Sequence, residues 1–405
     1  MDFDESPEDA AFRSEVRAWF ARPEVVREVH NFEGLTPDDD LDWVAVAKVW
    51  QRFLADEGWA CVTWPVQYGG RGGTATQAAI FAEESARVGA FGATFAVGIA
   101  MAGPTIIAHG SDEQKRRYLP PMLRGDEVWC QLFSEPGAGS DLAGLSTRAV
   151  RDGDEWVIDG QKVWTSGAHF SDWGILLTRT DVDRPKHRGI TYFLLDMQTA
   201  GIDIRPLRQI TGTAHFNEVF LTGVRIPHAN VLGEVNGGWA VTMTTLASER
   251  TFMGSHSRAL GYADLASLAS CSARDTDAVV RQRLADSFSR AELARYTNMR
   301  VRTQTSRGLP SGPEVSVAKL AAAWNLKRNG ELALAIEGAA GMLSGEDAPA
   351  GGAWQLSFLG APAIRIAGGS DEIQRNVIGE RVLGLPAEPR VDKMLPFRDL
   401  PRGTT

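Results

Sequence analysis

Cysteine is scarce in this chain, with three copies in 405 residues, at positions 61, 130 and 271. An odd and scattered set indicates neither a disulfide framework nor zinc-ligand spacing, and the seven histidines show no metal-like pairing. The opening Met-Asp-Phe-Asp-Glu lacks the basic character of a signal or transit peptide, and no apolar run is long enough to span a membrane. We therefore expect a cytoplasmic protein with no membrane span and no metal site.

Positive charge is also in the minority, because 51 Asp and Glu outnumber 42 Lys and Arg and give a net charge of −9. This balance argues against nucleic acid as a partner. What the chain does have is a globular composition, with 43% hydrophobic and 23% charged residues. Its length is enough for two or three domains.

Two helical regions flank a β-rich one. Ser6, Pro7 and the acidic residues after them are typical of a helix start. Beyond residue 128, β-rich runs of strand length follow Asp-Gly dipeptides that are typical of hairpins, and helical spacing returns near Trp239. We predict an α+β, mainly α fold with a helical domain at 1–127, an antiparallel β-domain at 128–235, a helical domain at 236–386 and a surface tail at 387–405.

A glycine-rich turn at Leu132–Asp141 is the first candidate for a binding site. Pro136 fixes its own φ, and the glycines around it allow main-chain N–H groups to approach a flat ligand, with Ser134 and Ser140 at the two ends. An ordinary surface turn has the same composition. A nicotinamide-binding Rossmann motif is rejected, because the third glycine is misplaced at Gly144 and hairpins follow instead of a βαβ unit.

The second candidate is the run Gln161–Gly167, which follows an Asp-Gly turn and is predicted to be a strand. Trp164 can stack on a planar heterocycle, while Thr165 and Ser166 can bond its polar edge. A core tryptophan beside a solvent-facing serine is the competing interpretation.

Together these motifs resemble the acyl-CoA dehydrogenase family. The similarity covers the chain from its N-terminal helices to about residue 386, and its motifs occur in the family order: 134–141, 159–167, 224–227, 230–234, 237–239, 369–375 and 380–384. The resemblance implies a helical domain, a β-barrel or sandwich, and a four-helix bundle. It also implies FAD as cofactor, an acyl-CoA substrate and an electron-transfer flavoprotein as electron acceptor.

The resemblance also assigns residues to this site. Those that resemble contacts of the flavin ring are Phe133, Ser134, Trp164 and Ser166. Ser370 and Glu372 resemble residues near the FAD phosphates and ribityl chain, and Ser140 resembles a contact to the CoA arm.

The chemistry implied by the family removes an α-proton from the thioester, which suits a carboxylate in a dry pocket. Many members carry this Glu where the present chain has Gly368. A minority carry it on the first long helix after the β-domain, followed by Arg, and here Glu249 and Arg250 occupy that place. We therefore predict Glu249 as the base and Arg250 as a residue that orients it or the CoA; an exposed Glu–Arg pair is the alternative. The Gly368 N–H remains a candidate donor to the thioester carbonyl.

Two family motifs that serve a neighbouring subunit's FAD are missing. The stretch 267–275 lacks Arg-x-x-Phe-Gly, and 335–339 lacks Gln-x-x-Gly-Gly. A hetero-oligomer with a related subunit and a homo-oligomer with substituted contacts are both compatible with these losses. The chain is then either the dehydrogenase itself, an FAD-poor partner subunit, or another flavin enzyme such as a nitroalkane oxidase or monooxygenase.

Overall fold

The computed structural model describes residues 5–32, 40–87, 94–255, 260–306, 312–389 and 392–400. The chain divides into two compact units, which we describe separately. The sheet unit comprises Pro7–Gln209, Thr213–Phe252 and Pro389–Thr405, and the helical unit comprises Met253–Glu388 with two short pieces, Met1–Ser6 and Ile210–Gly212. None of the described helices is long and apolar enough to cross a membrane.

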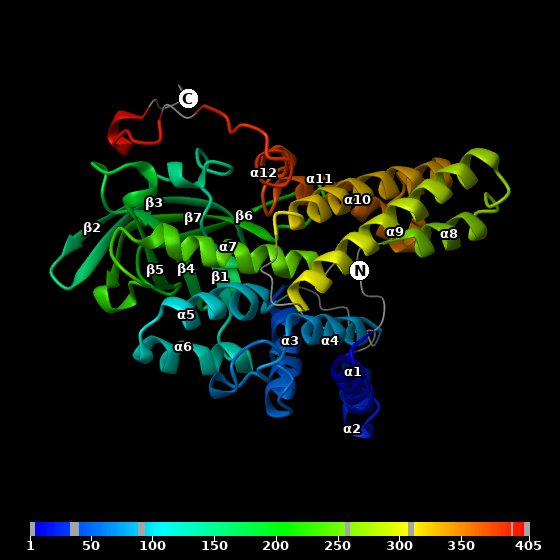
Figure 1. The fold of residues 1–405 in the computed structure, drawn as a ribbon, viewed down its shortest axis with the longest axis horizontal. Helices are drawn as coiled ribbons and strands as arrows, with labels where there is room; N and C mark the ends of the chain where they lie inside the picture. The colour runs from blue at the N-terminus through cyan, green and yellow to red at the C-terminus, as the bar shows by residue number, and fades with distance from the viewer. Residues whose placement is uncertain are drawn as a thin grey trace. The chain divides into compact units, whose positions relative to one another are not determined.

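Helices form the N-terminal part of the sheet unit (Figure 1). Their bounds are α1 (Pro7–Phe20), α2 (Pro23–Phe32), α3 (Asp40–Asp56), α4 (Ala75–Arg87), α5 (Gly103–His109) and α6 (Asp112–Arg124), with a π-helical segment, η2, at Val97–Ala102. The start of α6 shows why the chain folds this way locally, because Ser111 and Gln114 form a reciprocal capping box. Gly125 ends the same helix in the left-handed conformation.

A seven-stranded sheet follows. Its strands are β1 (Trp129–Leu132), β2 (Arg148–Asp152), β3 (Glu155–Ser166), β4 (Trp173–Arg179), β5 (Ile190–Asp196), β6 (Ile202–Leu207) and β7 (Phe216–Pro227), and their order is β1-β4-β2-β3-β7-β6 with β5 paired to β4. The predicted antiparallel pairing holds for β2–β3, β3–β7, β4–β5 and β6–β7. It fails for β1–β4 and for one residue pair of β2–β4, which are parallel. Since β1 and β2 both run parallel to β4, the connection between β1 and β2 crosses back to the end of the sheet where β1 began, and the β2–β3 hairpin then starts and finishes at that end before β4 begins.

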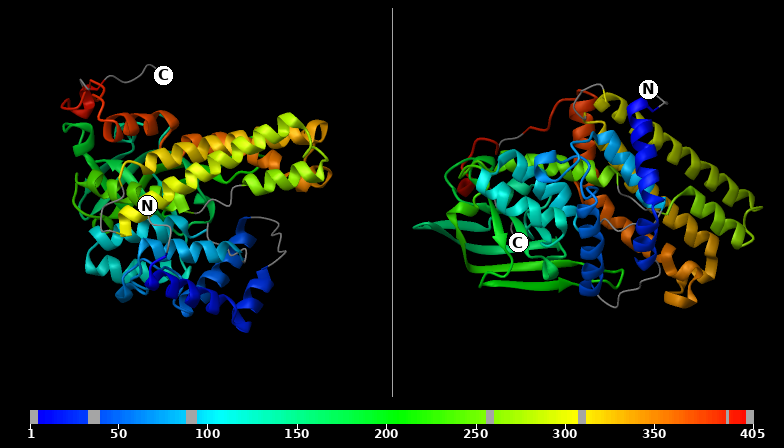
Figure 2. Two further views of the ribbon diagram at one scale, coloured as in Figure 1. Left: turned by 45° about the vertical axis from the view of Figure 1, so that its right-hand side comes forward. Right: turned by 90° about the horizontal axis from the view of Figure 1, so that it is seen from below.

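The sheet separates two hydrophobic cores. Along β4, Ile175 and Leu177 pack into the first core, whereas Leu176 between them packs into the second. The first core includes Ile106 of α5 and Leu119 of α6, so these helices cover one face of β1, β4 and β5 (Figure 2). The second core joins the opposite face of β4 and β5 to β3 and β7. The sheet therefore curls around its own inner core, because side chains alternate between the two faces of each strand.

After the sheet, helix α7 (Gly238–Ser255) belongs to the sheet unit up to Phe252. The helical unit contains α8 (Tyr262–Cys271), α9 (Ala278–Ser306), α10 (Val315–Glu337), α11 (Ala353–Ile366) and α12 (Asp371–Val377). Helix α10 contacts the other four, and its Leu332, Ala333 and Ile336 form a core with residues of α8 and α11. The expected fold class, a β-domain between two helical regions, is confirmed.

Residues 392–400, within the expected surface tail, are anchored to the sheet unit by one buried side chain. Phe397 is 8% exposed, and the Arg179 guanidinium lies 3.9 Å from its ring centroid. Main-chain bonds from Phe397 N–H to Arg184 and from Arg398 N–H to Val182 attach the segment to the loop after β4. Residues 392–400 thus cover part of the loop after β4.

Replacing Phe397 with Ala should release this segment. Burial of a Phe side chain is worth about 2 kcal/mol, so we expect the detached form to become about 30-fold more populated. Limited proteolysis within 392–400 measures that population. Met394→Ala is the matched control, because Met394 lies on the same segment and is exposed. Equal cleavage of the two variants would contradict the anchor.

Candidate functional site

The Ser134 loop is closed upon itself and bonded to β3. Glu135 and Ala138 exchange two main-chain hydrogen bonds of 3.0 Å, which make a tight turn around Pro136 and Gly137. The Ser134 carbonyl accepts a 2.9 Å bond from the Val163 N–H. The two segments singled out in the sequence therefore lie side by side, with Ser134 next to the strand residue that precedes Trp164.

A buried ion pair lies beneath this loop. Lys162 is fully buried in β3, and its Nζ donates to the Glu135 carboxylate at 2.8 Å and to the Phe133 carbonyl at 3.2 Å. The Glu135 carboxylate also accepts hydrogen bonds from the N–H and hydroxyl of Ser146 and from the N–H of Thr147. Because both charges are out of water, neither partner can be lost without leaving an uncompensated charge.

The pair shifts the pKa of both partners. Burial alone would raise the pKa of Glu135, but the charge of Lys162 and the hydrogen bonds to its carboxylate outweigh burial, so the net pKa lies below the ordinary value. Burial lowers the pKa of Lys162, and Glu135 opposes that shift. Each group therefore depends on the other to remain ionised.

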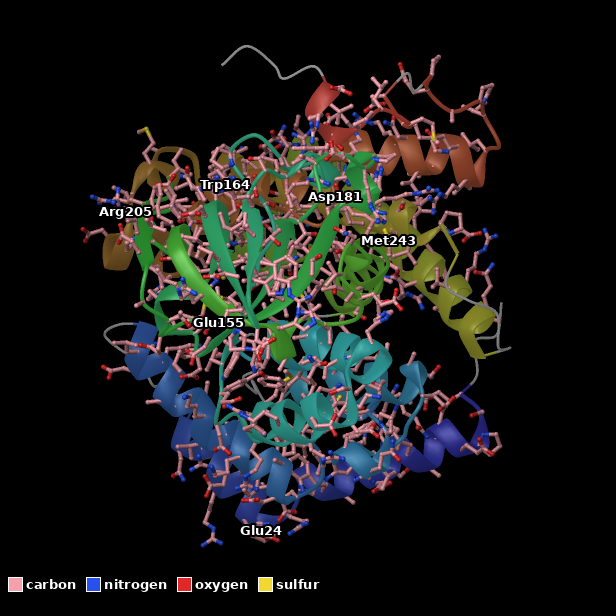
Figure 3. All side chains as sticks on the ribbon, turned by 90° about the vertical axis from the view of Figure 1, so that its left-hand side faces the viewer. Glu24, Glu155, Trp164, Asp181, Arg205 and Met243 are labelled. Atoms are coloured by element: carbon pink, nitrogen blue, oxygen red, sulfur yellow. The ribbon has the colours of Figure 1, made fainter. Side chains whose placement is uncertain are left out.

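Trp164 is held outward by a β-bulge. The register of β3 against β7 shifts between Lys162 and Thr165, and Trp164 has a φ of 61°, in the left-handed region. For a bulky residue this conformation costs about 1–3 kcal/mol. The indole is 59% exposed and meets Phe216 edge-on at 6.0 Å between ring centroids, at the opposite end of β3 from Glu155 (Figure 3). An aromatic face is thus presented at the sheet end at a conformational cost.

Polar groups surround the bulge. Ser166 is half-buried at the end of β3 and pairs with Phe216 of β7. Thr165 and its strand partner Asn217 are fully buried, and the Thr165 hydroxyl and the Asn217 Oδ1 have no hydrogen-bond partner within the described residues. A site with exposed indole, serine hydroxyls and main-chain N–H groups fits a planar, hydrogen-bonding heterocycle.

The other two residues expected near this loop have different surroundings. The Phe133 side chain is 3% exposed and meets Tyr192 edge-on at 5.8 Å in the first core. Ser140 is exposed, and its neighbour Asp141 accepts a 2.9 Å bond from Lys186. Ser140 is therefore accessible to a ligand, whereas Phe133 serves as a core residue through its side chain.

Glu249 lies on the sheet-facing side of α7. Thr245, one turn before it, is fully buried and bonds the Tyr192 hydroxyl at 3.1 Å and the Thr105 hydroxyl at 3.0 Å. Residues four apart on a helix share a face, so these bonds also set the direction of Glu249. The Glu249 carboxylate accepts a 3.4 Å bond from Gln131 of β1. The Arg250 side chain lies outside the described residues.

The remaining predicted residues belong to the helical unit. Gly368 and Gly369 have φ of 63° and 90°, a conformation that L side chains rarely adopt, which accounts for glycine where a carboxylate was sought. Ser370 caps α12 by accepting from the Ile373 N–H at 3.4 Å. Glu372 is exposed in the first turn of α12, where its own N–H and the Ser370 hydroxyl lower its pKa.

Sequence reasoning missed Gln131, Lys162 and Glu135. Lys162 had a signal, because alternation from Trp156 and Ile158 places it on the inward face of β3. The sequence also contained a signal for Gln131, since it is the single amide in the apolar run 128–133. The partner of each is 27 or 118 residues away, so spacing along the chain did not reveal either pair.

Replacing Lys162 with Met should leave a buried, unpaired carboxylate at Glu135. We expect a loss of about 3–5 kcal/mol in the free energy of unfolding of the sheet unit, measured by chemical denaturation at neutral pH. The double variant Lys162→Met/Glu135→Gln removes both charges and should recover most of that loss. A single variant as stable as the parent would show that the pair does not stabilise the loop.

The single variant Lys162→Met should also reverse the direction in which the contribution of Glu135 to stability changes with pH. In the parent, the folded-state pKa of Glu135 is lowered, so its contribution to stability is present above the ordinary glutamate value of 4.5 and is lost as pH falls through the folded value. Without Lys162, burial raises this pKa, and stability should fall as pH rises above that ordinary value. Melting temperatures measured against pH for the two proteins test this difference in slope.

Comparisons with known proteins agree with this architecture. Family models match in succession: acyl-CoA dehydrogenase N-terminal domain at residues 6–126, middle domain at 130–224 and C-terminal domain at 236–383. Acyl-CoA dehydrogenase IpdE1 of Mycobacterium tuberculosis is 41% identical over 393 residues, which cover 94% of this chain and 98% of that protein.

Two solved structures are similar over nearly the whole chain. The Tcur3481-Tcur3483 steroid ACAD is 31% identical, with a TM-score of 0.81, and the match covers 96% of this chain and 100% of that one. The ChsE4-ChsE5 complex from Mycobacterium tuberculosis is 30% identical, with a TM-score of 0.76 and the same coverage. The resemblance seen in the sequence is confirmed: the chain belongs to the acyl-CoA dehydrogenase family and is an oxidoreductase that acts on acyl-CoA.

Proposed function

We propose that this chain is an FAD-dependent dehydrogenase that introduces an α,β double bond into an acyl-CoA thioester. Glu249 takes the α-proton on its carboxylate. FAD, held by the residues around Ser134, Trp164 and Ser166, would supply the redox chemistry as the acceptor of the β-hydrogen. An electron-transfer flavoprotein is the expected electron acceptor, and the expected compartment is the cytoplasm.

The bulge at Trp164 is the observation that carries the cofactor assignment. A left-handed tryptophan with an exposed indole is costly unless a ligand uses its face. Ser134 and Ser166 add hydroxyls beside it, and these groups suit the edge of a flavin ring. We assign these three residues to the isoalloxazine surroundings, with Phe133 contributing through the loop that it anchors. Ser370 and Glu372 are assigned to the phosphates and ribityl chain.

The orientation of α7 supports Glu249 as the base. Its carboxylate is half-buried and is directed toward β1, the strand that leads into the Ser134 loop. A general base must be held within reach of the proton that it removes. Arg250 is proposed to orient the carboxylate or the CoA, Ser140 to bond the CoA arm, and the Gly368 N–H to polarise the thioester carbonyl.

For the acyl group we propose a bulky, ring-bearing chain of the steroid type. Support comes from the similarity of this chain to the Tcur3481-Tcur3483 protein, which is a steroid ACAD. Gly368 also removes side-chain bulk from the position where many family members carry a carboxylate.

Two assemblies are compatible with the sequence, a homo-oligomer and a hetero-oligomer with a related subunit, and the following features favour the second. The ChsE4-ChsE5 structure is a complex, and the Tcur3481-Tcur3483 steroid ACAD likewise carries two component names. The present chain lacks the two family motifs that serve a neighbour's FAD, and at the second of them Glu337 bonds Gln355 within its own unit. A related partner that supplies the missing groups is consistent with these features.

Glu249→Gln tests the base. We expect the rate of flavin bleaching by an acyl-CoA, under anaerobic conditions, to fall about 10²–10⁴-fold, while FAD content stays at the parental level. Glu113→Gln, on exposed α6 surface, is the matched control. Full turnover in flavin-loaded Glu249→Gln would overturn the assignment.

Purification of the chain alone tests the assembly and the competing functions. A homo-oligomer with full FAD occupancy removes the need for a partner. Absence of flavin, regained with a related subunit, would identify a partner subunit instead. Rapid reaction of the reduced flavin with oxygen would favour an oxidase or monooxygenase over a dehydrogenase.

A further inference from the structure

One amide on the helix-facing side of the sheet is not explained by packing. In β1, Cys130 and Leu132 point into the inner core, whereas Trp129 and Gln131 alternate to the other face, which α5, α6 and α7 cover. Gln131 is half-buried among apolar neighbours there. An amide in such a position loses hydration and needs a partner.

Its partner is the proposed base. Gln131 Nε2 donates to the Glu249 carboxylate at 3.4 Å, across a sequence separation of 118 residues. An amide N–H stabilises a carboxylate and fixes its rotamer without taking up a proton itself. The bond involves one carboxylate oxygen.

The two elements are held independently of this bond. Gln131 pairs with Ile175 of β4, which fixes the strand. On α7, Thr245 is fixed by the Tyr192 and Thr105 hydroxyls, one turn before Glu249. With both backbones fixed, the amide can restrict the remaining freedom, which is that of the Glu249 side chain.

The same strand runs directly into the Ser134 loop, because β1 ends at Leu132. A single rigid element therefore carries both the amide that contacts the base and the loop assigned to the flavin ring. Through β1, the position of the Glu249 carboxylate is therefore linked to that of the loop proposed to hold the flavin, and a displacement of about 1 Å between reacting groups can cost about 100-fold in rate.

We propose that Gln131 is a positioning residue that holds the Glu249 carboxylate in the orientation for proton abstraction. This proposal rests on the proposed function, specifically on Glu249 as the base. Gln131 acts through Glu249 and takes no part in proton transfer itself.

Gln131→Met, which keeps the length of the side chain and removes the amide, tests this role in the flavin-loaded protein. We expect flavin reduction by a saturating acyl-CoA to slow about 10–100-fold, the effect of losing a hydrogen bond to a charged group. The deuterium isotope effect from an α-deuterated thioester should increase, while the dissociation constant of the acyl-CoA and FAD content stay unchanged. Gln198→Met, at an exposed turn of the same sheet, is the matched control. An unchanged rate and isotope effect would overturn the proposal.

A double-mutant cycle separates positioning from general damage. In Glu249→Asp the carboxylate is one methylene shorter and withdrawn from the amide, so adding Gln131→Met should cost little more. If the double variant slows flavin reduction by the product of the two single effects, Gln131 does not act through Glu249. If Gln131→Met fails to load FAD, Gln131→Asn replaces it in the double-mutant cycle. This variant keeps the amide on a side chain that is one methylene shorter, and its rates of flavin reduction are judged by the same criteria. Turnover at the parental level in Glu249→Gln would refute Glu249 as the base. If Glu249→Gln loses turnover while Gln131→Met keeps the parental rate, only the positioning role of Gln131 is refuted.

Discussion

The buried pair of Lys162 and Glu135 is the contact on which the rest of this site depends. It ties the Ser134 loop to β3 through both a charge and the Phe133 carbonyl. The loop then accepts the Val163 N–H, one residue before the bulge that turns Trp164 outward. Since an unpaired charge at either position is strongly unfavourable, the pair makes one arrangement of loop and strand far more stable than others.

The site also shows how a local irregularity creates a binding surface. Alternation along β3 puts Trp156, Ile158 and Lys162 inside, and continued alternation would put Trp164 there too. The bulge inserts an extra residue, so Thr165 is buried and Trp164 is exposed. An indole that would otherwise have extended the inner core is thereby available to a ligand.

Composition and periodicity predicted the helical–β–helical order and the segments that meet at the Ser134 loop. They did not predict the parallel pairing of β1 with β4, because it depends on the connection after β1, which crosses back to the other end of the sheet and does not turn as a hairpin. They also could not find the Gln131–Glu249 contact, since the strand and helix that bring the two together are fixed by core packing. Glycine at 368 was visible in the sequence, but its physical reason, a left-handed φ, was not.

The anchoring of Phe397 bears on how the protein is made. The sheet unit begins with α1 but receives its final segment, 392–400, only after the whole helical unit has been synthesised. During translation, Arg179 and the loop after β4 therefore lack their cover until those residues emerge from the ribosome. A chain that stalls or is cleaved before residue 392 would therefore carry a sheet unit in which the Arg179 guanidinium and the loop after β4 lack the Phe397 ring that covers them in the finished protein.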